Sequence, residues 1–261
     1  MIRVAIIGAT GYTAHESILI LLRHPQAQVT YLTALPEECA PLTEVFPALQ
    51  GRLDLPIEPV DLNKLAGCAD VALCCLPHKV SMSFVPKLLA AGVKVVDFSA
   101  DYRIRDVALY EKVYKVEHTD RENLARAAFG LPELFRQKIV GAALVANPGC
   151  YPTAASLALA PLLKERLIDP ADIYINAVSG VSGAGRKAAL AFHFPEMNDN
   201  LFGYAVGTHR HMPEIEQILT QAAGQPVQVL FQPHVVSMDR GIAESIYCQP
   251  TGKITPAQLT D

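Results

Sequence analysis

The chain has 261 residues, of which 51% are hydrophobic and 18% are charged, and its formal net charge is -4. This composition supports a large core and excludes wholesale disorder, because apolar side chains are abundant enough to be buried together. The acidic net charge and the lack of a basic run argue against a nucleic-acid-binding surface.

The first predicted element is a short apolar strand over residues 4–7, followed by a glycine turn and a helix over 16–22. The turn reads Gly8-Ala-Thr-Gly-Tyr-Thr-Ala14. In a dinucleotide-binding fold, Gly8 would permit the tight turn and Gly11 would let the backbone approach a pyrophosphate. Glycine turns between strands and helices are common. The place of this turn directly behind an N-terminal strand nevertheless favours the cofactor interpretation. Because Met1 leads straight into this strand, no signal peptide is expected.

The second predicted strand, over 29–33, ends without the acidic residue that usually binds the ribose 2′-hydroxyl of NAD. The first carboxylates after it are those of Glu37 and Glu38. The missing acid favours NADP, although no arginine follows at once to hold a 2′-phosphate. Residues 36–62 are rich in proline and glutamate, and we interpret them as a long surface connection with short strands.

Apolar runs over 70–76 and 93–98 predict strands that are buried on both faces, with a helix over 81–91 between them. This alternation is typical of a doubly wound parallel sheet, which binds ligands at the C-terminal ends of its strands. Two of those ends carry His78 and Arg103. His78 is either a solvated loop residue or part of a cofactor cleft, and Arg103 is either a surface ion-pair residue or a grip for phosphate or carboxylate.

A third strand end carries Asn147-Pro-Gly-Cys-Tyr-Pro-Thr153, between a strand predicted over 139–145 and a helix predicted over 154–163. Such a turn directs the Cys150 thiol outward beside a helix N-terminus, whose partial positive charge favours the nucleophilic thiolate. The alternative is a small buried cysteine in a tight turn, and this stretch alone leaves the two evenly balanced. The six cysteines contain no Cys-x-x-Cys pair, so reduced cytoplasmic thiols are expected, without a disulfide framework or a zinc site.

The composition changes after this turn, and we place a domain boundary near Pro148. This predicts a dinucleotide-binding domain over 1–147 and a catalytic domain over 148–261. The second domain is expected to contain strands and a helix, over 172–179, 227–236 and 244–248 for the strands and 215–222 for the helix.

A glycine loop and two histidines stand out in the second domain. The loop Ser179-Gly-Val-Ser-Gly-Ala-Gly-Arg-Lys187 is either a mobile connection or a binding loop whose amides face an anion or a nicotinamide ring. His209 and His211 precede the predicted helix without an evident third ligand, so a metal is not expected. A general acid/base that serves Cys150 is the preferred interpretation.

Five motifs together resemble the N-acetyl-gamma-glutamyl-phosphate reductase family, NADPH-dependent enzymes of arginine biosynthesis. Their order and spacing fit over essentially the whole chain, and they read Gly8-Ala-Thr-Gly-Tyr-Thr-Ala14, Asp97-Phe-Ser-Ala-Asp-Tyr-Arg103, Asn147-Pro-Gly-Cys-Tyr-Pro-Thr153, Ser179-Gly-Val-Ser-Gly-Ala-Gly-Arg186 and His209-Arg-His-x-Pro-Glu214. The resemblance implies an α/β fold, in which a Rossmann-type dinucleotide-binding domain precedes an α/β catalytic domain of the kind found in aspartate-semialdehyde and glyceraldehyde-phosphate dehydrogenases.

The resemblance also implies roles for individual residues. Cys150 would be the nucleophile and His209 the acid/base. The NADP contacts would be made by Gly8, Ala9, Thr10, Gly11, Tyr12, Thr13, Gly183, Ala184 and Gly185, and the substrate contacts by Arg103, Asn147 and His211. The partners implied are a small acyl phosphate and further copies of the chain, as a dimer or tetramer in the cytoplasm, with no metal, membrane or nucleic acid.

The implied reaction is attack of the Cys150 thiolate on an acyl phosphate, release of phosphate, and reduction of the thioester to N-acetylglutamate 5-semialdehyde. The alternatives are the same chemistry on an aminoadipyl or aspartyl phosphate, a dinucleotide-binding fragment without activity, and a thiol hydrolase. Two departures from the family are visible. Residues 34–37 replace the usual Ser-Arg, and family members continue for several tens of residues past Asp261, so the chain is interpreted as C-terminally incomplete.

Overall fold

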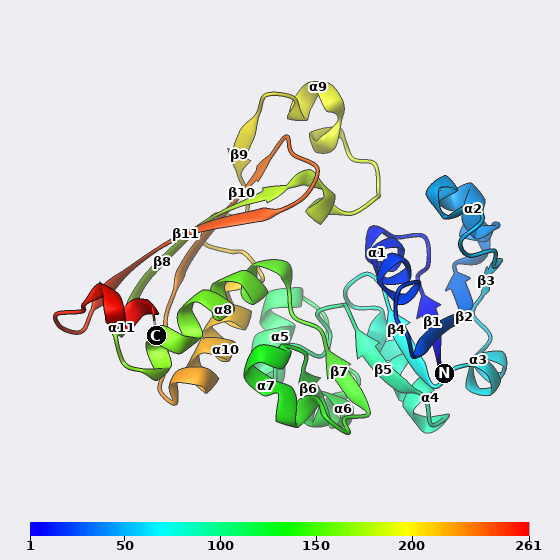
Figure 1. Ribbon diagram of the computed structural model, residues 1–261, viewed down its shortest axis with the longest axis horizontal. Helices are drawn as coiled ribbons and strands as arrows, with labels where there is room; N and C mark the ends of the chain where they lie inside the picture. Colours follow the sequence, from blue (N-terminus) through cyan, green and yellow to red (C-terminus); the bar gives the residue numbers. More distant parts are fainter. Residues whose placement is uncertain (261) are drawn as a thin grey trace. The chain divides into compact units, whose positions relative to one another are not determined.

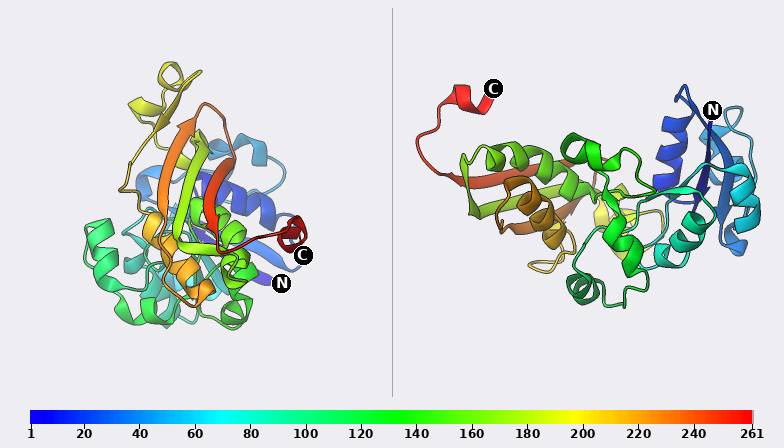
Figure 2. Two further views of the ribbon diagram at one scale, coloured as in Figure 1. Left: turned by 90° about the vertical axis from the view of Figure 1, so that its left-hand side faces the viewer. Right: turned by 90° about the horizontal axis from the view of Figure 1, so that it is seen from below.

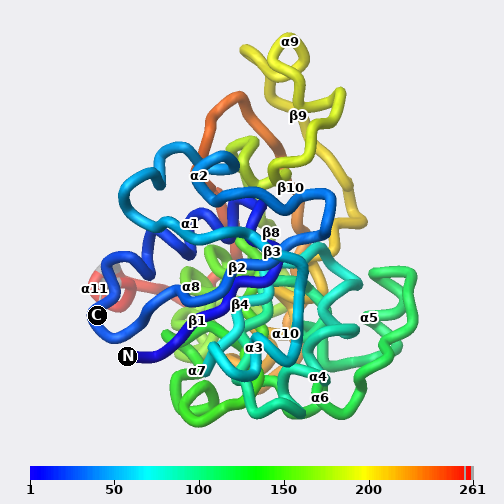
Figure 3. The backbone as a smooth tube through the Cα atoms, turned by 90° about the vertical axis from the view of Figure 1, so that its right-hand side faces the viewer, coloured from blue at the N-terminus to red at the C-terminus, as the bar shows by residue number. Residues whose placement is uncertain are grey.

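The computed structural model describes residues 1–260, which form two compact units, one ending at Pro148 and one beginning at Gly149 (Figure 1). The first unit is built on a seven-stranded sheet in the order β3-β2-β1-β4-β5-β7-β6, and the inner strands are visible side by side in Figure 3. The paired strands are all parallel, and their bounds are β1 (Ile2–Ile7), β2 (Ala27–Ala34), β3 (Ile57–Pro59), β4 (Val71–Cys74), β5 (Lys94–Asp97), β6 (Ala128–Phe129) and β7 (Leu144–Ala146).

The strand order reverses between β1 and β4, so this is the predicted doubly wound sheet. Both of its faces are covered. Ile6 packs with the α1 side of the sheet, whereas Ile7 packs with the opposite side, which α3 to α6 cover. The helices of this unit are α1 (Tyr12–Leu21), α2 (Leu42–Val45), α3 (Leu62–Cys68), α4 (Val85–Ala90), α5 (Val107–Tyr114), α6 (Arg121–Arg126) and α7 (Pro132–Ile139), with short 3-10 turns η1 (Pro36–Glu38), η2 (Pro47–Leu49) and η3 (Ser81–Ser83).

Two predictions for the first unit need correction, although β3 is one of the short strands that were expected within residues 36–62. Residues 36–62 are not simply a surface connection, because Leu42, Leu49 and Ile57 are buried under α1. Short helical turns bring these apolar side chains inward without a regular period, which sequence patterns cannot reveal. The strand predicted over 139–145 is largely absent. Helix α7 continues to Ile139, a turn at Gly141 with φ +80 follows, and only Leu144–Ala146 is a strand.

The second unit is a four-stranded sheet in the order β11-β8-β10-β9, with two long helices on one face. Figure 2 shows α8 and α10 side by side along this face. Buried Ile173, Ile175 and Ala177 alternate with exposed residues along β8, as predicted for this strand. The elements are α8 (Cys150–Lys164), β8 (Ile168–Gly180), η4 (Val181–Ala184), η5 (Leu190–Phe192), α9 (Phe194–Met197), β9 (Leu201–Gly203), α10 (Met212–Ala223), β10 (Leu230–Val236), β11 (Ile242–Pro250) and α11 (Pro256–Thr260).

None of the helices within residues 1–260 is long and apolar enough to cross a membrane. In the same residues, no three histidine, cysteine, aspartate or glutamate side chains are grouped so that they could hold a metal ion.

Candidate functional site

Cys150 is the first residue of the fifteen-residue helix α8, and its side chain is exposed. Gly149 precedes it as an extended N-cap residue with φ -65 and ψ 158. The first turn of a helix carries amides without intrahelical partners, and their partial positive charge stabilises an anion. The predicted place of the thiol at a helix N-terminus is therefore confirmed, and the alternative of a buried structural cysteine is wrong.

The turn before the thiol is held by a buried carboxylate. The backbone N–H of Gly149 donates a hydrogen bond of 2.8 Å to Oε1 of Glu214, and Glu214 is fully buried. Glu214 lies in the first turn of α10, so this bond joins the starts of two helices. A Cβ atom on Gly149 would lie only 2.6 Å from Nε2 of His211, so any larger residue here would displace the His211 ring.

Both predicted histidines lie against the residues that flank Cys150. The ring of Tyr151, the next residue in α8, lies 5.7 Å from the ring of His209 and 5.9 Å from that of His211. The two histidine rings are 4.8 Å apart, and the buried ring of Phe231 lies 5.2 Å from His209. The fold thus brings the segment that carries both histidines to the start of α8.

His209 is a neutral imidazole at pH 7. The backbone N–H of His211 donates a 3.1 Å hydrogen bond to Nδ1 of His209, which assigns the ring proton to Nε2. Burial, assisted by the neighbouring Arg210 charge, lowers the pKa of His209 to about 4. A neutral ring supplies no cationic charge that would lower the pKa of a neighbouring thiol. It presents a hydrogen-bond donor at Nε2 instead.

The glycine loop begins close to the same helix. The Tyr151 hydroxyl shares a 3.1 Å hydrogen bond with the Tyr204 hydroxyl and contacts the side chain of Ser179, the penultimate residue of β8. Burial raises the pKa of Tyr151, so its hydroxyl stays protonated. The next part of the loop is exposed and includes Gly183, Ala184 and Gly185, the last of which has φ +88. The loop therefore starts at the aromatic cluster and presents its backbone outward.

In the first unit, the turn after β1 has the shape needed for a pyrophosphate. Gly8 has φ +84, and a Cβ atom on it would lie 2.5 Å from the carbonyl oxygen of Cys75, so no other residue fits. The amides of Gly8 and Ala9 donate to the carbonyl of Thr33 at 2.9 and 2.8 Å. Gly11 then caps α1, whose N-terminus lies at the β1–β4 switch point, where doubly wound sheets bind dinucleotides. These residues fit a dinucleotide.

Arg103 and Asn147 are tied to the backbone of the first unit. Arg103 is only 5% exposed, and it donates from Nε to the carbonyl of Asn147 at 2.7 Å and from its terminal nitrogen to the carbonyl of Phe98 at 2.8 Å. The Asn147 side-chain amide donates to the Pro148 carbonyl at 3.1 Å. These contacts favour a role for Arg103 as a brace between the ends of β5 and β7. Its predicted grip on the substrate stays a prediction.

His78 has a comparable structural partner. The backbone N–H of Ala100 donates to Nδ1 of His78 at 3.0 Å, and the N–H of Lys79 donates to the buried carboxylate of Asp101 at 2.7 Å. The loop after β4 is thereby fastened to the loop after β5. This arrangement explains a histidine at the strand end without requiring contact with a cofactor.

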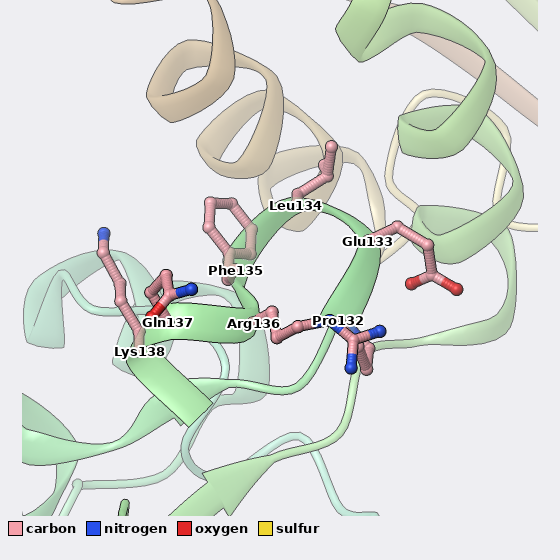
Figure 4. A pocket seen from close by; sticks show the side chains of 7 residues that line it. All are labelled: Pro132, Glu133, Leu134, Phe135, Arg136, Gln137 and Lys138. Carbon is pink, nitrogen blue, oxygen red and sulfur yellow. The ribbon is translucent and has the colours of Figure 1, made fainter. Parts of the chain in front are cut away.

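A hollow of about 490 Å³ lies on α7 and is lined by residues 132–138 alone. Figure 4 shows these side chains spreading outward from one short helical segment. A binding site usually has polar groups that converge on a common point, and this hollow does not have them. It also contains none of the residues that the sequence singled out.

Comparison with protein families agrees with the fold. Residues 3–142 match the model described as "Semialdehyde dehydrogenase, NAD binding domain", and residues 150–261 match "Semialdehyde dehydrogenase, dimerisation domain". A solved structure of aspartate semialdehyde dehydrogenase with NADP from Candida albicans superposes with a TM-score of 0.72 at 16% identity, over 98% of this chain and 73% of that one. The protein is thus of the semialdehyde dehydrogenase class.

Sequence relatives narrow the class to one family. The chain is 47% identical to the N-acetyl-gamma-glutamyl-phosphate reductase of Rhodopirellula baltica over 97% of this chain and 73% of the relative. It is 50% identical to the enzyme of the same name from Desulforudis audaxviator, over 96% of this chain and 72% of the relative. The chain belongs to the N-acetyl-gamma-glutamyl-phosphate reductase family, and it spans about three quarters of the length of these relatives.

Proposed function

We propose that this protein reduces N-acetyl-gamma-glutamyl phosphate to N-acetylglutamate 5-semialdehyde and releases phosphate, with NADPH as the reductant. The observation that carries the proposal is the exposed Cys150 at the start of α8. The amide of the preceding Gly149 is hydrogen-bonded to the buried Glu214, and the rings of two histidines lie against Tyr151, the residue that follows Cys150. We assign cofactor binding to residues 1–147 and catalysis to residues 148–261. The dimerisation-domain match further supports a homo-oligomer.

Cys150 is assigned as the nucleophile. Its sulfur attacks the acyl carbon of the acyl phosphate, the bond from carbon to the phosphate oxygen breaks, and a thioester forms. The N-terminus of α8 favours the thiolate that this attack requires. The bond from Gly149 to Glu214 fixes the backbone on which the sulfur is carried.

His209 is assigned as the acid/base, and in its neutral form it acts as a hydrogen-bond donor. Its proton lies on Nε2, so it can donate a hydrogen bond to the oxygen that becomes negative when the thioester carbonyl is reduced. The reduced thioester is a hemithioacetal anion, and its collapse breaks the bond from carbon to sulfur, releases the aldehyde and regenerates the Cys150 thiolate. His211, which packs on Gly149, is assigned to the substrate together with Arg103 and Asn147.

The dinucleotide, when bound, supplies the hydride that reduces the thioester. In the first unit we assign its contacts to Gly8, Ala9, Thr10, Gly11, Tyr12 and Thr13, and in the second unit to Gly183, Ala184 and Gly185. The lack of space for a Cβ atom at Gly8 and the start of α1 at Tyr12 support the first set. The exposed backbone of residues 183–185 supports the second.

The test is NADPH oxidation in the presence of N-acetyl-gamma-glutamyl phosphate, with aminoadipyl and aspartyl phosphates assayed in parallel. We expect the N-acetylglutamyl compound to give the highest kcat/KM. A higher value for another acyl phosphate would reassign the substrate. Stabilisation of the protein by NADPH without turnover of any acyl phosphate would indicate a dinucleotide-binding module, and acyl phosphate cleavage that does not need NADPH would indicate a thiol hydrolase.

A further inference from the structure

The carboxylate of Glu38 lies against the proposed phosphate loop. The hydroxyl of Thr10 donates a 2.9 Å hydrogen bond to Oε2 of Glu38. Thr10 belongs to the turn between β1 and α1, and Glu38 ends the 3-10 turn η1, which follows β2. An acidic side chain therefore stands near the carboxyl end of β2, although the strand itself ends without one.

The position matters because doubly wound folds distinguish NAD from NADP at the end of the second strand. A carboxylate near the end of the second strand accepts a hydrogen bond from the ribose 2′-hydroxyl of NAD, whereas a cation at the same place holds the 2′-phosphate of NADP. A carboxylate has about four lone-pair sites, so the bond from Thr10 leaves acceptor capacity for a ribose hydroxyl. Glu38 thus has the chemistry that suits the hydroxyl.

The charges of the neighbouring sequence act in the same direction. The chain has no lysine or arginine between Arg23 and Arg52, and this span contains three carboxylates, those of Glu37, Glu38 and Glu44. Glu38 is exposed, and it lies within hydrogen-bond distance of the loop. A phosphate monoester on the 2′ position would bring nearly two further negative charges close to this carboxylate.

We propose that Glu38 determines how this protein discriminates between the two nicotinamide dinucleotides. Its carboxylate weakens the preference for NADPH over NADH. Its carboxylate accepts the ribose 2′-hydroxyl of NADH and repels the 2′-phosphate of NADPH. Thr10 is the positioning residue that holds the carboxylate in place. The inference rests on the proposed cofactor site and goes beyond it, because it assigns specificity to a residue outside the glycine turn.

The main test is Glu38→Gln, which keeps the shape and a hydrogen-bonding group but removes the charge. We expect the dissociation constant for NADP⁺ to fall about tenfold and that for NAD⁺ to rise a few-fold, since hydrogen bonds to charged groups contribute more than neutral ones. The matched control is Glu37→Gln, which removes the same charge one residue earlier in η1. Both constants are measured by titration calorimetry, so the result does not depend on turnover.

A second variant, Thr10→Val, removes the hydroxyl that positions Glu38. We expect it to change the ratio of the NADP⁺ and NAD⁺ dissociation constants in the same direction as Glu38→Gln, but by less. The proposal is wrong if Glu38→Gln changes the ratio no more than Glu37→Gln does. Binding of both dinucleotides with no acyl phosphate reduction would instead contradict the proposed function and leave the Glu38 result valid. Failure to bind either dinucleotide would overturn both.

Discussion

The amide of Gly149 donates a hydrogen bond to the buried carboxylate of Glu214, and this bond ties the start of α8 to the first turn of α10. Cys150 is the next residue, so the direction of its sulfur depends on a contact with a distant part of the chain. Nothing in the order of residues shows what the carboxylate in His209-Arg-His-x-Pro-Glu214 faces. We therefore expect Glu214 to act as a positioning residue, a role that the sequence by itself does not reveal.

Removal of the Glu214 carboxylate tests this role. Glu214→Ala leaves the Gly149 amide without this acceptor, and the loss of a hydrogen bond to a charged group costs about 1.5 to 3 kcal/mol. We expect kcat to fall about tenfold to a hundredfold, with NADPH binding unchanged. Glu214→Gln retains an oxygen acceptor and is expected to restore much of the activity. A uniform loss in both variants that follows only their unfolding midpoints in urea would show a purely structural role.

Substitution of the nucleophile has a different signature. Cys150→Ser replaces the thiolate with a hydroxyl that is not ionised near pH 7, and we expect acyl phosphate reduction to fall by at least about a thousandfold. The dissociation constant for NADPH should stay within about twofold. The matched control is Cys248→Ser on β11, which is expected to keep nearly full activity. Residual turnover within a few-fold of the wild-type rate would contradict the assignment of Cys150.

A titration of the Cys150 thiol tests whether His209 carries a charge. Alkylation of Cys150 by iodoacetamide, followed against pH, should reveal a pKa below the usual value of about 8.5, because the thiol lies at a helix N-terminus. A cationic ring at His209 would lower that pKa further, and His209→Asn would then raise it. Since the pKa of His209 itself is lowered to about 4, the ring is neutral and the substitution should leave the thiol titration nearly unchanged.

Turnover supplies the second readout for the same pair. His209→Asn should lower kcat strongly, because the donor at Nε2 is lost. His211→Asn should mainly raise KM for the acyl phosphate, because His211 is assigned to the substrate. If His211→Asn has the stronger effect on kcat, the two roles are exchanged. A thiol pKa that rises in His209→Asn would show that the ring is cationic in solution.

The sequence was most informative where burial imposes a pattern. The runs over 70–76 and 93–98 are continuous because β4 and β5 have helices on both faces of their sheet, and β8 alternates because only one face is covered. Helix α8 begins at Cys150, four residues before the predicted start at 154, so Pro152 lies inside the helix. A proline is tolerated in the first turn, where its missing N–H would have no helical partner.

The contacts that organise the site could not be predicted, because each joins segments that are distant in sequence. The role of Arg103 in binding an anion stays a prediction, but the sequence could not show that this side chain is buried and donates to the carbonyls of Phe98 and Asn147. The hydrogen bond between Thr10 and Glu38 could not be predicted either, because the loop after β2 has no regular sequence pattern. A residue type restricts the chemistry that a side chain can perform, but tertiary packing decides which partner it has.

The last expectation concerns stability and pH. Glu244 lies on β11, where it pairs with Ala177, and both of its carboxyl oxygens are buried without a hydrogen-bond partner among residues 1–260. Burial raises the pKa of Glu244 to about 7, from an ordinary value of 4.5. The folded protein therefore binds more protons than the unfolded chain between these two values. Stability contributed by the protonated form should be lost as the pH rises through this window.

Glu244→Gln removes the charge while keeping the shape. We expect the variant to be more stable than the wild type at pH 8 by about 1 to 3 kcal/mol, and to differ little from it at pH 4, where the carboxyl is protonated in both states. Urea unfolding at pH 4, 6 and 8 gives the comparison directly. The matched control is Glu196→Gln in the first turn of α9, whose side chain is exposed, so the loss of its charge should not stabilise the protein. Equal free energies of unfolding for the wild type and Glu244→Gln at pH 8 would show that the Glu244 carboxylate is solvated in solution.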